Sequence, residues 1–230
     1  MTTPRYALYF APAAGHPLWT AGCAWLGRDP ESGATTAGGA CRAEPRRYGF
    51  HATLKAPFGL REGASRSQLL AALTRFADER SPFDMPPLAV ATLGDFVALR
   101  PVARDAAAAG QPLRALADDC VRLFDDFRAP PSGAELARRL AADLDAGQRG
   151  NVDRWGYPHV FDRWRFHMTL SDSLPATVEG DRAGAALVAD ATRHFAAALA
   201  SPLRCAGIAL FVEDAPGADF RLDRRFDFAR

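Results

Sequence analysis

Two five-residue phrases, Phe50-His51-Ala52-Thr53-Leu54 and Phe166-His167-Met168-Thr169-Leu170, repeat nearly the same pattern far apart in one chain. Bulky apolar residues alternate with polar ones in each phrase, which is typical of a β-strand with one buried face. On such a strand the histidine and the threonine share the other face. The phrases therefore predict two strands that together present two imidazoles and two hydroxyls to one cleft.

A histidine and a threonine on the same strand face suit chemistry at a phosphate group. Imidazole has an ordinary pKa of about 6.5, so one histidine can accept a proton while another donates one. A threonine hydroxyl can donate to a phosphate oxygen, and its β-branch leaves it few rotamers. We therefore expect His51 and His167 to act as acid and base, in either order, at a phosphodiester, with Thr53 and Thr169 on the phosphate.

Neighbouring residues supply candidates for substrate contact. Lys55, the only lysine in the chain, and Ser171 each follow a histidine by four positions, and Arg165 precedes His167 by two. All three lie on the cleft side if the strands are regular, where the two cations could contact phosphate. Lys55 could equally have no special role. Tyr48 and Tyr157 could stack on a base or sugar, or cover an edge of the core.

Composition restricts the class of protein. The 230 residues are 48% hydrophobic, enough to bury a sizeable core. A net charge of +1 makes extended nucleic-acid binding or an anionic membrane partner unexpected, so we expect a small phosphorylated substrate recognised locally. Four dispersed cysteines without a CxxC pair indicate reduced, mostly buried thiols. No secretory leader or long apolar span is evident, and we expect a soluble, cytoplasmic protein.

The chain divides into two halves with a similar order of elements. The first half predicts strands at about 5–10 and 88–100, helices at about 17–26 and 65–80, and an aperiodic loop over 27–45. The second half predicts the strand of the second phrase, a helix at about 184–200 and strands at about 203–212 and 220–228. This similarity suggests duplication of a small α+β unit.

A helical stretch over about 112–148 separates the halves and is broken at Ala129-Pro130-Pro131-Ser132-Gly133. We expect it to bridge them. The predicted organisation is a single two-lobed α+β domain over 1–230, with lobe 1 at about 1–110, bridging helices at about 111–148 and lobe 2 at about 149–230.

Several stretches resemble the two-histidine (2H) phosphoesterase superfamily. The two phrases resemble its paired HxT signatures, and residues 5–12, 25–29, 46–57 and 155–158 are similar to a branch often encoded with bacterial phosphonate-utilisation genes. The resemblance implies a bilobal α+β fold with pseudo-twofold symmetry, in which two antiparallel sheets flank a central cleft and helices lie outside. It also implies His51 and His167 as acid and base, Thr53 and Thr169 on the phosphate, and no metal or other cofactor.

The expected function is a metal-independent phosphoesterase that hydrolyses a small ribose or nucleoside cyclic phosphate, which the branch resemblance connects with phosphonate metabolism. Two alternatives stay open: a nucleotide or sugar-phosphate binding module without activity, and an RNA-end cyclic phosphodiesterase or 2'-5' ligase-like protein. A zinc site is not indicated, because the two histidines have no third ligand at a recognisable spacing. We interpret His16, His159 and His194 as incidental, and no Walker phosphate loop is present.

Overall fold

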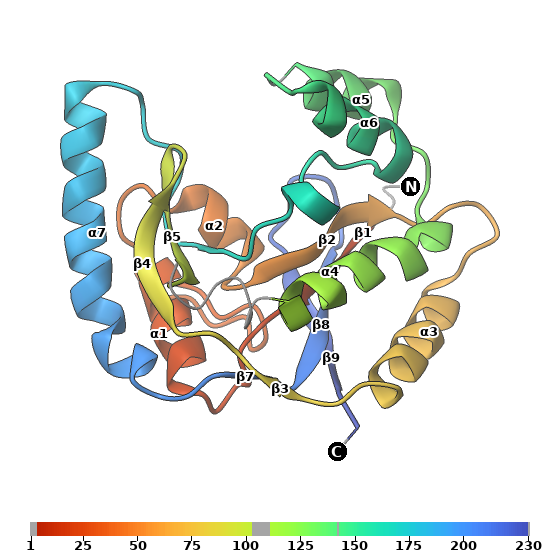
Figure 1. Ribbon diagram of the computed structural model, residues 1–230, viewed down its shortest axis with the longest axis horizontal. Coiled ribbons are helices and arrows are strands. Elements are labelled where there is room, and N and C mark those ends of the chain that lie inside the picture. Colours follow the sequence, from red (N-terminus) through yellow and green to blue (C-terminus); the bar gives the residue numbers. More distant parts are fainter. Residues whose placement is uncertain (1–3, 103–110, 142, 230) are drawn as a thin grey trace.

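A four-stranded antiparallel sheet lies at the centre of the computed structural model, which describes residues 4–102, 111–141 and 143–229 (Figure 1). Its order is β2-β1-β8-β9, formed by Ala52–Gly59, Arg5–Phe10, Gly207–Glu213 and Arg221–Asp227. The two inner strands, β1 and β8, are almost entirely buried, as expected for apolar strands with a neighbour on each side. The first histidine phrase enters this sheet at its edge, where β2 pairs with β1.

A second antiparallel sheet receives the other histidine phrase. Its order is β4-β5-β6, formed by Leu88–Leu93, Phe96–Pro101 and Met168–Thr169. β4 and β5 form a hairpin at Gly94, whose φ of +61° suits a residue without a side chain. β6 pairs only two residues with β5. A separate two-stranded ribbon joins β3, Phe83–Asp84, to β7, Arg204–Cys205.

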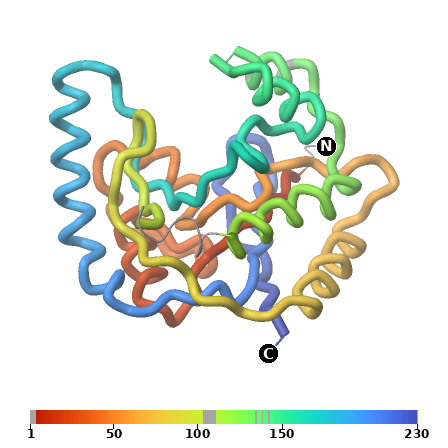
Figure 2. Tube along the Cα trace, in the orientation of Figure 1, coloured from red at the N-terminus to blue at the C-terminus, as the bar shows by residue number. Residues whose placement is uncertain are grey.

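Helices cover the outer faces of these sheets (Figures 1 and 2). Helix α7 packs against β4, β5 and α1, whereas α4 packs on β2 and α3 on β9. Helices α5 and α6 contact each other and lie at the top right of Figure 1. The seven α-helices of the described chain are α1 Pro17–Leu26, α2 Ala43–Tyr48, α3 Arg66–Asp78, α4 Gln111–Leu123, α5 Gly133–Leu140, α6 Ala146–Trp155 and α7 Val178–Leu199.

Local signals in the sequence explain where several helices begin. Ser65 and Gln68 form a capping box at the start of α3, and Asp145 and Gln148 form another at α6, so two otherwise unpaired backbone donors are satisfied at each end. His16 caps α1 by accepting a hydrogen bond from the Leu18 backbone at 3.1 Å. This histidine therefore has a structural role as the cap of α1.

The expected α+β class with antiparallel sheets and outer helices is confirmed, and strands from the two halves of the sequence share the sheets. The sheet that contains β1 and β2 is completed by β8 and β9 from the second half, and the sheet of β4 and β5 is completed by β6. The division into lobes at about 1–110 and 149–230 therefore stays a prediction, because the strand order mixes elements of both ranges. Strand pairing depends on which strands become neighbours in the folded protein. The order of the strands along the chain does not by itself predict those neighbours.

Most predicted elements lie within a few residues of those observed. The differences are local: the loop predicted over 27–45 ends in α2, the helical stretch after residue 111 contains three helices, and the second phrase contributes only the two residues of β6. Cys41 is exposed, whereas Cys120 and Cys205 are buried. Among the described helices, none has both the length and the apolar character needed to cross a bilayer.

Candidate active site

The apolar residues of both phrases are buried, which holds each phrase against the core. Phe50 and Phe166 are 0% and 5% exposed, and both leucines are at most 1% exposed. Phe50 lies against Gly22 of α1, where an added Cβ would be 2.2 Å from the ring. The histidine and threonine of each phrase are half-buried, as the alternation predicts.

The two imidazoles are held in the same way. Nδ1 of His51 lies 2.8 Å from the carbonyl oxygen of Gly49, and Nδ1 of His167 lies 2.8 Å from that of Arg165. A carbonyl oxygen can only accept a hydrogen bond, so Nδ1 is the donor in both rings. In the neutral form, Nε2 is therefore the proton acceptor of each imidazole.

His51 lies in the more enclosed of the two environments. Its ring stacks on Tyr9 with centroids 3.7 Å apart, and its Nε2 lies 3.2 Å from the Thr53 hydroxyl, which is the donor. Burial lowers the pKa of His51 to about 4, the charge of His167 contributes to the lowering, and the Gly49 carbonyl opposes it. At neutral pH this imidazole is uncharged.

His167 lies beside Phe96, with ring centroids 5.6 Å apart. Burial also lowers the pKa of His167, and the charges of His159 and Arg100 act in the same direction, while the Arg165 carbonyl opposes them. His167 lines an open pocket directly.

The structure brings the two phrases together. β2 and β6 are in contact, and Trp164 donates from its indole Nε1 to the Thr53 carbonyl at 2.9 Å. A pocket of about 440 Å³ beside them is lined by Thr53 and His167, and Arg165 and Tyr157 also line it. His51 adjoins this pocket through its hydrogen bond to the Thr53 hydroxyl. The charge of His167 is the smallest of the causes that shift the pKa of His51.

Of the other residues predicted to contact substrate, Arg165 and Tyr157 line this pocket, whereas Tyr48 and Thr169 do not. Arg165 is exposed, and its guanidinium has no hydrogen-bond or ion-pair partner among the described residues. Tyr48 lies 6.2 Å from His51 between ring centroids and stacks on Phe220. Thr169 is half-buried and pairs through its backbone with Ala98 of β5.

Lys55 and Ser171 are corrected, because neither lines the pocket beside the histidines. The Lys55 ammonium is buried and donates to Asp125 at 3.0 Å and to the Val121 carbonyl at 3.1 Å. The pairing of β2 with β1 is irregular on both sides of Lys55, so alternation fails there.

Ser171 lies beyond the end of the short strand β6. It accepts from the Val97 backbone at 3.0 Å and donates to the Asp172 carbonyl at 2.9 Å. Both of its hydrogen-bonding roles are therefore taken up within the protein.

His159 lines the pocket, although its sequence position suggested no role. Its Nδ1 lies 3.5 Å from the Gln148 amide, and its ring contacts Tyr157 edge-on. The only available signal was its proximity to Tyr157, which was itself a candidate. Within the described ranges, no three His, Cys, Asp or Glu side chains gather where they could hold a metal ion.

These features define an α+β protein in which two alike histidine phrases meet beside one pocket. Residues 53–221 match the family model described as "Protein of unknown function (DUF1045)", and the chain belongs to that family.

Two longer bacterial proteins are similar to almost the whole chain. The "Ribose 1,5-bisphosphate phosphokinase PhnN" of Janthinobacterium sp. (strain Marseille) is 38% identical, over 98% of this chain and 51% of that protein. The protein of the same name from Laribacter hongkongensis (strain HLHK9) is 40% identical, over 96% and 51%. The chain thus spans about half the length of these curated relatives.

Among solved structures, Kluyveromyces marxianus Usb1 aligns with a TM-score of 0.41 and 10% identity, over 96% of this chain and 98% of that one. The structure of the same protein with uridine monophosphate aligns with a TM-score of 0.35 and 11% identity, over the same shares.

Proposed function

We propose that this protein is a metal-independent phosphoesterase of the two-histidine type, which hydrolyses a small cyclic phosphodiester. One observation carries the proposal: two imidazoles, each fixed by a carbonyl two residues earlier, lie beside one pocket, which His167 lines directly and His51 adjoins through the Thr53 hydroxyl. The pocket volume of about 440 Å³ is in the range of small-molecule sites. Arg165, whose guanidinium is uncommitted, supplies a positive charge for the phosphodiester.

The different environments assign a role to each histidine. His51, whose pKa is about 4, is neutral at pH 7 and serves as the base that takes a proton from water. His167 serves as the acid. A bound phosphodiester anion beside it favours the imidazolium and raises its pKa in the complex.

The reaction is an in-line displacement at phosphorus. The water oxygen bonds to phosphorus, its proton goes to Nε2 of His51, and the bond from phosphorus to one ring oxygen breaks. That oxygen receives the proton of His167 and leaves as a sugar hydroxyl, so the product is a phosphomonoester. When substrate binds, the Thr53 hydroxyl exchanges its hydrogen bond to Nε2 of His51 for one to a non-bridging oxygen. The Thr169 hydroxyl donates to the other non-bridging oxygen, and Arg165 balances their charge.

The names of the relatives favour a ribose phosphate as substrate. Those proteins are named for a kinase of ribose 1,5-bisphosphate, and this chain matches about half of each. The sequence has no GxxxxGK[ST] phosphate loop. We therefore assign the named kinase activity to the part of the relatives that this chain does not match. Opening a ribose cyclic phosphate would supply a ribose phosphomonoester to the same phosphonate-related metabolism.

A panel of cyclic phosphates tests the proposal, with ribose 1,2-cyclic phosphate and nucleoside 2',3'-cyclic phosphates as substrates. Phosphorus NMR identifies the bond cleaved. We expect conversion to a phosphomonoester that persists in EDTA and is abolished in the His51→Ala/His167→Ala double variant. No cleavage of any member by the wild-type protein, or equal cleavage by the double variant, would overturn the proposal. Binding without cleavage would instead identify a binding module.

A further inference from the structure

A second cavity of about 180 Å³ adjoins the proposed active pocket. The two share Ala56, Tyr157 and Val160 as common walls. The second cavity is less than half the volume of the first, so it fits one functional group of a ligand better than a second molecule. We call it the arginine cavity, because Arg5, Arg128 and Arg139 line it.

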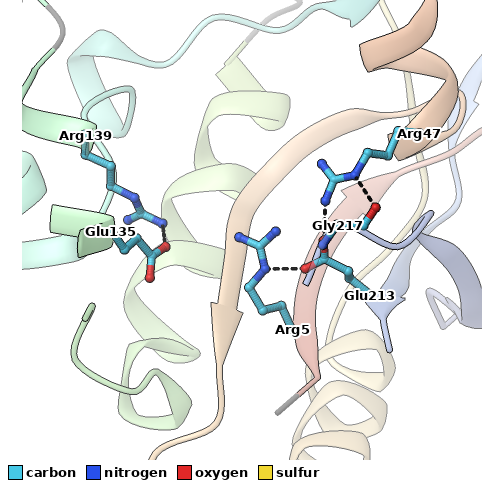
Figure 3. Close-up of polar contacts among 6 residues, drawn as sticks. All are labelled: Arg5, Arg47, Glu135, Arg139, Glu213 and Gly217. Carbon is cyan, nitrogen blue, oxygen red and sulfur yellow. Dashed lines mark hydrogen bonds and ion pairs between the residues drawn. The ribbon is translucent and has the colours of Figure 1, made fainter. Parts of the chain in front are cut away.

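Arg5 is hydrogen-bonded through Nε but not, within the described residues, through its two terminal nitrogens. Its Nε donates to Glu213, a fully buried carboxylate that Arg47 also contacts. The two terminal nitrogens of Arg5 have no hydrogen-bond acceptor among the described residues. Figure 3 shows Arg5 between Glu213 on one side and the pair of Glu135 and Arg139 on the other.

The other two arginines are oriented by carboxylates in the same way. Arg128 donates from Nε and Nη2 to Asp125, at 2.7 and 3.0 Å, and its Nη1 lies beside Gly156, where an added Cβ would be 3.0 Å away. Arg139 donates from Nη2 to Glu135, which also lines the cavity.

The charges of this cluster do not balance. Among the described residues that line the cavity, Arg5, Lys55, Arg128 and Arg139 are cations and Glu135 is the one carboxylate. An excess of positive charge in a concave, partly enclosed site attracts an anion. Guanidinium groups fixed by carboxylates are already oriented for the oxygens of a phosphate.

We propose that the arginine cavity binds a phosphomonoester on the same substrate whose cyclic phosphodiester lies beside the histidines. This inference rests on the proposed function and narrows its substrate to a sugar phosphate with two separate phosphate groups. The cation-rich lining of the cavity complements the negative charge of a phosphomonoester. Tyr157, which lines both cavities, contacts the sugar between them.

A ratio of activities tests this inference. The substrates are ribose 1,2-cyclic phosphate and the same compound with a phosphate on O5, and the measured quantity is the ratio of their kcat/KM values. In the wild-type protein we expect the doubly phosphorylated compound to be preferred by about 10- to 100-fold, the range of one charged hydrogen bond. In Arg139→Gln that ratio should decrease toward one, and Arg139→Lys should restore part of it.

The control is Arg193→Gln, which removes an arginine paired with an acidic residue on α7, outside both cavities. Both the activity and the ratio should stay at wild-type values. Arg5→Gln is a second probe, but it leaves the buried Glu213 with fewer partners, so its thermal unfolding is measured alongside. Equal kcat/KM values for the two compounds in the wild-type protein would overturn the inference.

Direct binding separates this inference from the proposed function. Ribose 5-phosphate, which contains no cyclic phosphodiester, should bind the wild-type protein and the His51→Ala/His167→Ala variant alike in calorimetry, and Arg139→Gln about 10- to 100-fold more weakly. Such binding without turnover of any cyclic phosphate would support the arginine cavity while the catalytic proposal fails. Equal binding by wild-type protein and Arg139→Gln would refute the cavity alone.

Discussion

The two histidine sites begin from nearly the same five residues and differ in their surroundings. Each imidazole donates from Nδ1 to the carbonyl two residues earlier, at 2.8 Å in both cases. His51, however, stacks on Tyr9 and bonds to Thr53, whereas His167 lines the open pocket beside Arg165. The phrase therefore determines the orientation and tautomer of the ring, and the neighbouring elements determine its pKa and access.

In the proposed mechanism, this difference gives the two histidines distinct roles. Two imidazoles in identical environments would have identical affinities for a proton, and neither would be favoured as acid or base. Deeper burial of His51 keeps it neutral, and access to a bound anion favours the proton on His167. The same local sequence can thus serve two opposite steps of one reaction.

The largest expected effect is loss of either imidazole. His51→Ala and His167→Ala should each decrease kcat for the cyclic phosphate by roughly 10²- to 10⁴-fold, because each removes one proton-transfer group. The assay is steady-state hydrolysis, with phosphorus NMR to identify the product.

The two variants should also differ in pH dependence. If His51 is the base and His167 the acid, the acidic limb of the kcat/KM profile should be lost in His51→Ala and the alkaline limb in His167→Ala. His194→Ala is the matched control, because this exposed histidine on α7 bonds to the Ala21 carbonyl away from the pocket. Wild-type rates in either phrase variant would contradict the assignment.

The residues that precede the two histidines provide a second test. Gly49 has a φ of +80°, and an added Cβ would be 2.7 Å from the Pro30 ring. Gly49→Ala should lower the free energy of unfolding by about 2–4 kcal/mol, from backbone strain and overpacking together. Arg165, at the same place in the other phrase, is exposed and has no positive φ.

Arg165→Ala should therefore change the free energy of unfolding by less than about 0.5 kcal/mol and raise KM instead. Urea denaturation and steady-state kinetics measure the two quantities. An equal decrease in the free energy of unfolding for Gly49→Ala and Arg165→Ala would contradict this prediction. It would mean that the positive φ of Gly49 does not make its position more sensitive than that of Arg165.

The alternation within the phrases was sufficient to predict which of their residues are buried. It was not sufficient for Lys55, because the two irregularities that turn its side chain toward Asp125 depend on how β2 pairs with β1. It also failed for Ser171, because β6 ends after Thr169. Periodicity describes a strand only as far as the strand continues.

The arrangement of the sheets and the arginine cavity could not be predicted from local sequence. Each sheet combines strands from both halves of the chain, and no local signal specifies that exchange. Arg5, Arg128 and Arg139 come from a strand, a loop and a helix that only the fold brings together. In a chain with many arginines, their sequence positions do not distinguish them from solvent-exposed ones.

Substitution of the two threonines also compares the two phrases, with a smaller expected effect on activity than loss of either histidine. Thr53→Val and Thr169→Val keep the shape of the side chain but remove the hydroxyl. If both hydroxyls donate to the phosphate, each change should lower kcat/KM by about 10- to 100-fold, the range of one hydrogen bond to a charged group. Thr53→Val should also shift the acidic limb of the pH profile, because Thr53 bonds to Nε2 of His51 and Thr169 has no such contact with His167.

Double variants with the histidines check this reading of the threonines. Thr53→Val in a His51→Ala background should have a smaller effect than in the wild-type protein, because the two side chains act on the same group. An unchanged rate in Thr169→Val would show that the Thr169 hydroxyl does not contact the phosphate. The two threonines would then not have equivalent roles in catalysis.

The smallest expected effect is on stability. Burial lowers the pKa of His51 from 6.5 to about 4, so between those values the unfolded chain binds more protons than the folded chain. Stability is therefore complete above about pH 6.5 and decreases as the pH falls toward 4, with a contribution from His51 of about 1–2 kcal/mol between about pH 7 and pH 5. His51→Gln should remove that contribution, so the variant loses less stability over this range.

His167→Gln should remove a contribution in the same direction, because burial lowers the pKa of His167 as well. Urea denaturation at the two pH values measures both differences. The same loss of stability in wild-type protein and His51→Gln would mean that the ring beside Tyr9 is protonated as easily as an exposed histidine. In that case the enclosed environment would not distinguish His51 from His167, and the assignment of base and acid would have no physical basis.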